Sequence, residues 1–352
     1  MKFGADHYVP VLKVKRGEKK ALQAIAPPLR SRITPLFEIV QRKEKTLSAH
    51  LDTAFKGLAD AARPYRRCFL DTREIEPDGQ AAATEVFERA DAAGMIFTPV
   101  TGLTRTTDTA AALAHQSNGI AIRLTRAEFE AGRIARGLPE FLTNHDLGDA
   151  EVDLIVDLGA VDQLVTQGVA NFADSFLADV PDQRRWRTLT LSACAFPIGM
   201  GGVETNSHAF VERCEWQAWR ASLFANRRTI VRLPTFSDCA IQHPSGVEDF
   251  DPRIMQVSAA VRYALSEKWL IIKGESTRSV PPSQQFPQLA TQLTYGHLLP
   301  YFAGPTHCDG CGSMKAAADG APGLGSPEVW RRLGTIHHLT RTAEELASLP
   351  WP

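Results

Sequence analysis

Three carboxylates, Glu38, Asp71 and Asp157, lie in or at the end of short apolar runs of the sequence. Such runs are typical of buried strands, in which side chains two residues apart share a face. If the runs are parallel strands, the three carboxylates converge on the edge formed by the strand ends. Oxygen ligands of this kind bind Mg2+, and a single carboxylate can act as a general base. We therefore predict a metal-binding or catalytic role for all three.

Cations close other apolar runs, namely Lys13, Arg123 and Arg232. Beside the carboxylates they would form an anion clamp for a phosphate-bearing small molecule or for nucleic acid. Burying one unpaired charge costs several kcal/mol, so a mixed ring of both signs is also self-consistent as a purely structural network. Three interpretations stay open: a structural ring, a phosphate or nucleotide site, and a site for another anionic or zwitterionic molecule.

Asp238 and His243 follow the last of these runs, in a predicted loop. An aspartate that orients a histidine would supply an acid/base pair there. A turn-forming aspartate and a surface histidine are the alternative.

The six cysteines divide into two groups. Four are isolated in apolar surroundings and are expected to be free, buried thiols: Cys68, Cys194, Cys214 and Cys239. Cys308 and Cys311 form a C-x-x-C pair preceded by His307. His337 and His338 could complete a Cys2His2 set, although helical neighbours point about 100° apart and at most one is expected to face such a site. A metal site, a redox pair and an ordinary loop all remain open.

Several reaction classes are excluded or disfavoured. Ser192 is not in a G-x-S-x-G elbow, and no G-x-x-x-x-G-K-[ST] phosphate loop occurs. The fourth apolar run ends without the acid that barrel glycosidases usually place there. Basic segments at residues 13–16, 184–187 and 227–228 could contact phosphates, or could simply be solvated ends of helices and strands.

The elements that position these residues alternate between apolar runs and helical patterns. This alternation predicts a parallel (β/α)8 TIM-like barrel, with an open doubly wound sheet as the alternative. The predicted strands are residues 8–15, 33–40, 68–71, 95–100, 120–124, 152–158, 189–192 and 229–233. The helices predicted between them include residues 81–93, 107–115, 161–177 and 209–225.

The alternation of strand and helix patterns ends after the eighth predicted strand. Residues 260–265 and 269–273 predict a β-hairpin, and residues 285–299 a helix. A glycine-rich loop to residue 325 and a terminal helix or helix pair over 327–349 follow. We interpret residues 1–352 as one barrel domain, with barrel strands over about 8–233 and decorations over about 255–352.

The composition and the apolar runs of the sequence bear on which partners the protein has and where it is located. The 39 Lys and Arg residues nearly balance 40 Asp and Glu residues, which argues against general coating of DNA. The apolar runs are far shorter than the roughly 20 residues of a membrane span, and residues 1–6 contain no apolar signal region. We expect a cytoplasmic protein with no membrane contact.

Several segments resemble the beta protein family of phages and bacteria. The opening Tyr8-Val9-Pro10-Val11-Leu12-Lys13 and Thr34-Pro35-Leu36-Phe37-Glu38-Ile39 look like its first segments. Phe236-Ser237-Asp238, His243-Pro244, Arg262-Tyr263, Trp269, Lys273-Gly274, Trp330-Arg331, Gly334 and His337-His338-Leu339 are similar to its later ones. Ser237 stands where the family often has Gly, and Lys273 where it often has Arg; the C-x-x-C is outside the pattern.

The resemblance implies a phage- or prophage-associated protein of unassigned biochemistry. Lys273 joins the anion-binding candidates at its family position. Two classes of function remain: an enzyme, such as a metal-dependent phosphoester hydrolase, and a non-catalytic scaffold or interaction component of a phage-related or anti-phage defence complex with a protein partner.

Overall fold

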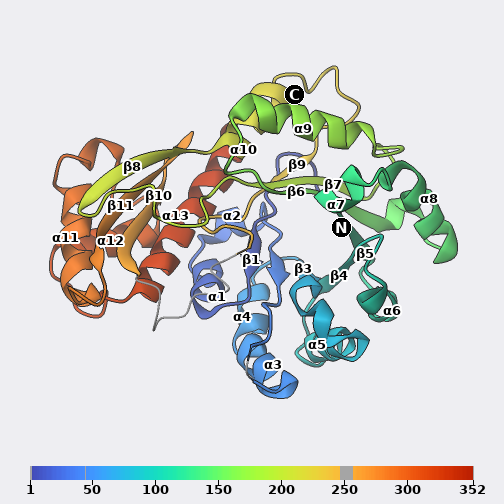
Figure 1. Cartoon of the computed structure of the whole chain (residues 1–352), viewed down its shortest axis with the longest axis horizontal. Coiled ribbons are helices and arrows are strands. Elements are labelled where there is room, and N and C mark those ends of the chain that lie inside the picture. The colour runs from blue at the N-terminus through green and yellow to red at the C-terminus, as the bar shows by residue number, and fades with distance from the viewer. Residues whose placement is uncertain (1, 44, 246–256, 352) are drawn as a thin grey trace.

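Eight parallel strands form a nearly closed barrel, which confirms the predicted (β/α)8 class (Figure 1). The computed structural model describes residues 2–43, 45–245 and 257–351. In barrel order the strands are β1 (Val11–Lys13), β2 (Leu36–Glu38), β3 (Cys68–Asp71), β4 (Phe97–Thr101), β5 (Ile120–Thr125), β6 (Val152–Ala160), β7 (Thr188–Cys194) and β9 (Thr235–Ser237). Backbone N–H groups of Val9 and Val11 donate to the carbonyls of Phe236 and Asp238, at 3.1 and 2.8 Å, and join β9 to β1.

Helices surround the barrel and cover its outer face (Figure 1). They are α1 (Arg16–Gln23), α2 (Pro27–Arg30), α3 (Leu47–Phe55), α4 (Leu58–Ala62), α5 (Gln80–Ala92), α6 (Thr106–Ala114), α7 (Arg126–Glu130), α8 (Ile134–Asn144), α9 (Thr166–Ala178) and α10 (Cys214–Ala218). Strand alternation separates two cores. Leu12, Phe37 and Leu70 pack outward against the helices, whereas Val11, Leu36 and Phe69 fill the barrel interior.

The prediction of the eighth strand is wrong in its boundaries. Residues 229–233 form no strand, and the strand is instead β9, from Thr235 to Ser237. A β-branched run alone could not distinguish the strand from the turn that precedes it. Arg232 consequently lies before the strand, where its guanidinium donates to the carbonyls of Gln183 and Trp186, just ahead of β7. The structure therefore places Arg232 at the N-terminal end of the barrel, away from Lys13 and Arg123.

A second polar layer closes that N-terminal end. Asp153 accepts hydrogen bonds from Arg67, Arg187 and Thr188, the shortest at 2.5 Å to Arg67. The Arg67 guanidinium also lies 5.3 Å from the ring centroid of Phe3, which packs against the interior core. The N-terminal end of the barrel is thus lined by paired charges, and the apolar interior lies beyond them.

The C-terminal part forms a separate layer beside the barrel (Figure 1). The predicted hairpin is confirmed as β10 (Ser258–Ala264) and β11 (Lys268–Ser276), and β11 also pairs with β8 (Ser207–Glu212). Residues 209–225 are therefore not one helix: β8 comes first, then α10 and a π-helical turn over Trp219–Phe224. Local periodicity could not predict this strand, because β8 is stabilised by pairing with a hairpin some 60 residues later in the chain. Residues 255, 256 and 352 of the predicted decorations lie outside the described part.

Three helices accompany this small sheet: α11 (Pro282–Thr294) and α13 (Pro327–Ser348) pack on its strands, and α12 (Asp309–Ala318) packs against both helices. The terminal helix is as predicted, whereas the expected glycine-rich loop contains α12. In Figure 1, α13 lies between the barrel and the sheet. Close approach there depends on Gly334, because a Cβ at this position would come within 2.6 Å of the Arg262 carbonyl oxygen.

Two of the thiols expected to be free are joined in a disulfide, Cys194–Cys239. The two cysteines are 45 residues apart in sequence, but Cys194 ends β7 and Cys239 follows the end of the neighbouring strand β9. Isolation in sequence therefore concealed proximity in the barrel. Cys68 and Cys214 are free, as expected, and Cys308 and Cys311, for which the sequence left several states open, also form no disulfide. Within the described residues, no helix is both long and apolar enough to cross a membrane.

The disulfide predicts a thiol count. Denatured, unreduced protein treated with a chelator should titrate four thiols with Ellman's reagent, and reduced protein all six. Closing a loop of this length contributes about 4 kcal/mol in the chain-entropy scheme, so reduction should also lower the thermal midpoint. Six reactive thiols without reductant would contradict the pairing.

Candidate functional site

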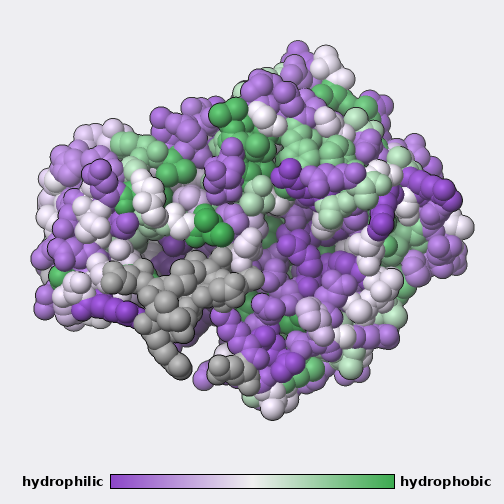
Figure 2. Space-filling view, in the orientation of Figure 1, coloured by the Kyte–Doolittle hydropathy of each residue, from purple (hydrophilic) through white to green (hydrophobic). Residues whose placement is uncertain are grey.

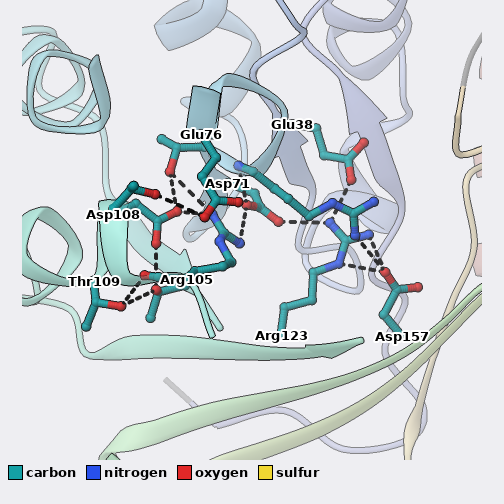
Figure 3. Close-up of polar contacts among 12 residues, drawn as sticks. Glu38, Asp71, Glu76, Arg105, Asp108, Thr109, Arg123 and Asp157 are labelled. Atoms are coloured by element: carbon teal, nitrogen blue, oxygen red, sulfur yellow. Dashed lines mark hydrogen bonds and ion pairs between the residues drawn. The ribbon is translucent and has the colours of Figure 1, made fainter. Parts of the chain in front are cut away.

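The barrel mouth carries a ring of charges centred on Arg123 of β5 (Figure 3). Its guanidinium contacts Glu38 at 2.6 Å, Asp71 at 2.8 Å and Asp157 at 2.7 Å. These residues come from β2, β3 and β6, and parallel register aligns Glu38 with Asp71. All four side chains are at most 4 % exposed. The three predicted carboxylates and Arg123 are therefore brought together, as the strand-end argument required.

Further arginines extend the ring; from sequence, Arg105 was missed, and Arg73 was noted after the third strand but not chosen as a candidate. Arg105 contacts Asp71 at 2.8 Å and also pairs with Asp108 of α6. Arg73 reaches Asp157 at 3.3 Å. Arg105 and Arg73 stand in the loops after β4 and β3, and a search for charges in every segment that follows a strand would have found them. We call Glu38, Asp71, Asp157, Arg123, Arg105 and Arg73 the arginine ring.

The electrostatics of the ring favour ionised carboxylates. Burial opposes ionisation of Asp71, but Arg105 and Arg123 outweigh it and hold the pKa of this carboxyl well below its usual range. Burial also opposes ionisation of Asp157, and Arg123 with Arg73 again lowers its pKa. Asp71 and Asp157 are thus charged and paired near neutrality. Because Arg123 binds all three, their predicted roles as Mg2+ ligands or bases would need this guanidinium to move.

The opposite side of the mouth is less completely bonded. Ser192 of β7 aligns with Asp157, and Ser237 of β9 aligns with Ser192. Their buried hydroxyls, like that of Thr190, find no hydrogen-bond partner among the described residues. Buried hydroxyls normally have partners, so this side of the mouth is where water or a small ligand would satisfy them.

Lys13 links the ring to a basic pocket. Its ammonium lies 3.8 Å from Glu74, and its side chain lines a cavity of about 830 Å3 at the ends of β1 and β2. The described residues lining this cavity include seven lysines and one arginine but no acidic residue: Lys13, Lys15, Arg16, Lys19, Lys20, Lys43, Lys45 and Lys56. We call it the lysine pocket. Glu44 lies outside the described residues.

Lys19 builds one wall of the lysine pocket. Its ammonium donates to the backbone carbonyls of Ala54 and Lys56, at 2.7 and 2.8 Å, and so binds the C-terminal end of α3 to α1. Cations are favourable at a helix C-terminus because the unpaired carbonyls there are partly negative. Burial lowers the pKa of Lys19. Only Lys13, Lys15 and Arg16 were singled out from sequence; the remaining lysines become neighbours through the packing of α1 on the segment after β2.

Asp238 lies in a different, fully buried network. It accepts hydrogen bonds from Tyr8 at 2.5 Å and His338 at 2.8 Å, and Arg213 lies 4.0 Å away. Arg213 also donates to Thr342 of α13. The Asp238 network therefore holds α13 against the outside of the barrel.

Asp238 does not orient His243, whose Nε2 lies 3.6 Å from Asp162 instead. Lys273 lies on β11, where its ammonium donates to the carbonyls of Met200 and Val203. The structure does not bring Lys273 to the arginine ring. His338 bonds to Asp238, whereas His337 points to the C-x-x-C pair.

The fold and its strand-end charges define a (β/α)8 barrel protein with an internally paired, charged mouth. The chain belongs to the Beta protein family, whose sequence model matches residues 8–344. This places it in a phage-associated family of unassigned function. A comparison with curated proteins finds none that matches.

Removing the central cation should destabilise the fold. Arg123→Met leaves three buried carboxylates without their shared partner, and we expect the free energy of unfolding to fall by about 3–5 kcal/mol in urea denaturation. Arg126→Met is the matched control, because Arg126 pairs with Glu130 on the exposed face of α7 and should change stability by less than about 0.5 kcal/mol. Equal midpoints for the two variants would show that the ring is not structural.

A buried glutamate beside the Asp238 network predicts a pH effect. Burial raises the pKa of Glu215 to about 8 from its usual 4.5, and Arg213 offsets this only in part. Between these values the folded chain keeps a proton that the unfolded chain has lost, so Glu215 lowers the free energy of unfolding as pH rises.

Glu215→Gln should therefore gain stability relative to the wild type between about pH 5 and pH 8.5. Urea denaturation at several pH values measures the difference. Glu140→Gln, in an exposed pair on α8, should show no such trend.

Proposed function

We propose that this protein binds a phosphate-bearing ligand in the lysine pocket, beside the barrel mouth. The observation that carries the proposal is the lining of the pocket, which among the described residues includes eight cations and no acidic residue. Lys13 and Arg16 pair with Glu74 and Glu328, which lie outside this lining. The whole chain has a net charge of −1, so this excess of one sign is local rather than a consequence of composition.

Like charges that share a pocket repel one another, and a bound anion relieves the repulsion. Lysine ammonium groups are compact, mobile cations suited to phosphate oxygens. A cavity of about 830 Å3 also falls in the size range of small-molecule sites. The ligand favoured by this chemistry carries more than one phosphate group, as a nucleotide or an oligonucleotide does.

The arginine ring limits what chemistry can accompany binding. Each of its three predicted carboxylates is already paired with Arg123 and so is not available as a metal ligand or base. This pairing supports a role in ligand binding more directly than a role in hydrolysis. Hydrolysis of the ligand with Mg2+ remains a further prediction. It requires the ligand phosphates to attract Arg123 and so release a carboxylate toward the metal.

The alternative proposal is a non-catalytic scaffold in a phage-related or anti-phage complex. Complete pairing within the arginine ring favours it, because a ring that only stabilises the barrel needs no ligand. A protein partner would then bind elsewhere, for instance at Phe210 of β8 and Tyr301 of the short 3-10 turn Leu299–Tyr301, which are 38 % and 42 % exposed with ring centroids 4.9 Å apart.

Ligand-induced stabilisation tests the binding proposal. Pyrophosphate, a nucleoside triphosphate and a short single-stranded oligonucleotide would each be added with and without Mg2+. A ligand at 100 times its Kd should stabilise the fold by about 2.7 kcal/mol, seen as a raised Tm. The affinity of the oligonucleotide should fall steeply with salt if its backbone occupies the pocket.

Paired variants locate the effect. Lys15→Ala combined with Lys45→Ala should weaken the binding at least tenfold, whereas Lys268→Ala, in an exposed pair on β11, should leave it unchanged. Loss of a Mg2+-dependent part of the shift in folded Asp71→Asn would extend the site to the ring. No shift with any anion would overturn the proposal and favour the scaffold.

A further inference from the structure

Two cysteines and two histidines meet where α12 begins against the middle of α13. Ligand atoms of His307, Cys308 and His337 all lie within 4.8 Å of one another. Cys311 joins them, with its sulfur 3.2 Å from Nδ1 of His337, while the Cys308 sulfur lies 4.0 Å from the same nitrogen. We propose that His307, Cys308, Cys311 and His337 bind one Zn2+ ion, and we call them the Cys2His2 cluster.

The spacing of the cluster suits tetrahedral zinc. With Zn–S bonds of about 2.3 Å and Zn–N bonds of about 2.0 Å, a tetrahedral site separates sulfur from nitrogen by roughly 3.5 Å. The two distances from His337 lie on either side of that value. Side-chain shifts would complete the geometry, with the Cys311 sulfur moving toward the three residues whose ligand atoms already lie within 4.8 Å of one another.

The imidazole of His337 is held in the orientation that a metal ligand needs. Its Nε2 lies 2.8 Å from the carbonyl oxygen of Ala264, which can only accept, so this nitrogen carries the proton. Nδ1 is therefore left with a lone pair directed at the two sulfurs. The ring also stacks on Tyr263 with centroids 3.8 Å apart, which fixes its plane. A backbone carbonyl behind a ligating histidine is a common feature of zinc sites.

His307 shows the same division of its two nitrogens. Nδ1 lies 3.5 Å from a carboxylate oxygen of Glu344 on α13. Nε2 is buried and has no hydrogen-bond partner among the described residues. A buried ring nitrogen without a partner is costly unless something absent from the protein itself satisfies it, and a metal ion would do so.

Each of the two sulfurs lies next to one hydrogen-bond donor of the protein. The backbone N–H of Cys311 donates to the Cys308 sulfur at 3.4 Å, at the first turn of α12. The Tyr263 hydroxyl accepts from the Ala303 N–H at 2.9 Å, so its own proton is available to the Cys311 sulfur 3.3 Å away. Gly310 between the cysteines lets this turn approach α13, because a Cβ there would lie 2.5 Å from the Leu333 carbonyl oxygen.

The metal class follows from the ligands. Two thiolates and two imidazoles in a tetrahedral arrangement select zinc over the oxygen-preferring Mg2+ and Ca2+. All four positions are supplied by the protein, which is typical of a structural site. The ion would fasten α12 to α13 next to His338, the residue that binds Asp238 of the barrel. This site is independent of the phosphate-binding proposal.

Metal content tests the proposal directly. Protein purified without chelators, under mild reductant, should contain one zinc ion per chain by atomic emission spectroscopy. Cys308→Ser and His337→Ala should each lose it, whereas Cys214→Ser, which removes a buried free thiol elsewhere, should keep it. Chelation should lower the Tm of the wild type and of Cys214→Ser but not that of the two cluster variants.

A wild-type measurement covers the case in which the cluster variants fail to fold. Co2+ added to reduced, metal-free protein should produce the visible bands of tetrahedral cobalt and a thiolate-to-cobalt charge-transfer band, and Zn2+ should abolish both. Wild-type protein without zinc that also gives no cobalt bands would overturn the proposal. So would a Cys308–Cys311 disulfide in freshly purified protein, which would mark a redox pair.

Discussion

The guanidinium of Arg123 is the interaction on which the barrel mouth depends. Without it, Glu38, Asp71 and Asp157 would be three like charges in a buried space, and each would cost several kcal/mol. Their attraction to Arg123 draws β2, β3, β5 and β6 together at the strand ends. At the other end, Asp153 with Arg67 and Arg187 does the same, so the apolar interior is enclosed between two charged layers.

This arrangement separates the structural and the ligand-accessible parts of the mouth. The arginine ring is internally neutralised and buried, whereas the lysine pocket next to it has an excess of cations and opens between α1 and α3. Lys13 belongs to the lysine pocket and aligns with Glu38 of the ring in the register of β1 and β2. Hydrophilic side chains gather over the middle of the barrel in Figure 2, while hydrophobic ones gather toward α9 and α10.

The family's later motifs meet where the C-terminal layer is attached to the barrel. Asp238 bonds His338, Gly334 packs against the Arg262 carbonyl, and Tyr263 stacks on His337. These contacts hold α13 between β9 and β10. The proposed zinc site adds α12 to the same assembly through His337. Residues that look catalytic by type, an aspartate and two histidines, are therefore largely engaged in joining two layers of the fold.

The sequence by itself determined the barrel, the hairpin, the terminal helix and the meeting of Glu38, Asp71, Asp157 and Arg123, because period-two alternation and parallel strands carry each of these to one edge. It could not place β9, which is the eighth strand of the barrel, or β8 of the small sheet. It also could not predict the Cys194–Cys239 pair or the lysine pocket. Each of these depends on segments distant in the chain becoming neighbours, and the local periodicity of a sequence carries no information on such long-range contacts. Arg232 shows the consequence. The eighth strand begins a few residues later than predicted, and this residue, predicted to bind a ligand at the barrel mouth, lies at the opposite end of the barrel. Which charges neutralise one another, and which remain for a ligand, was decided only by tertiary packing.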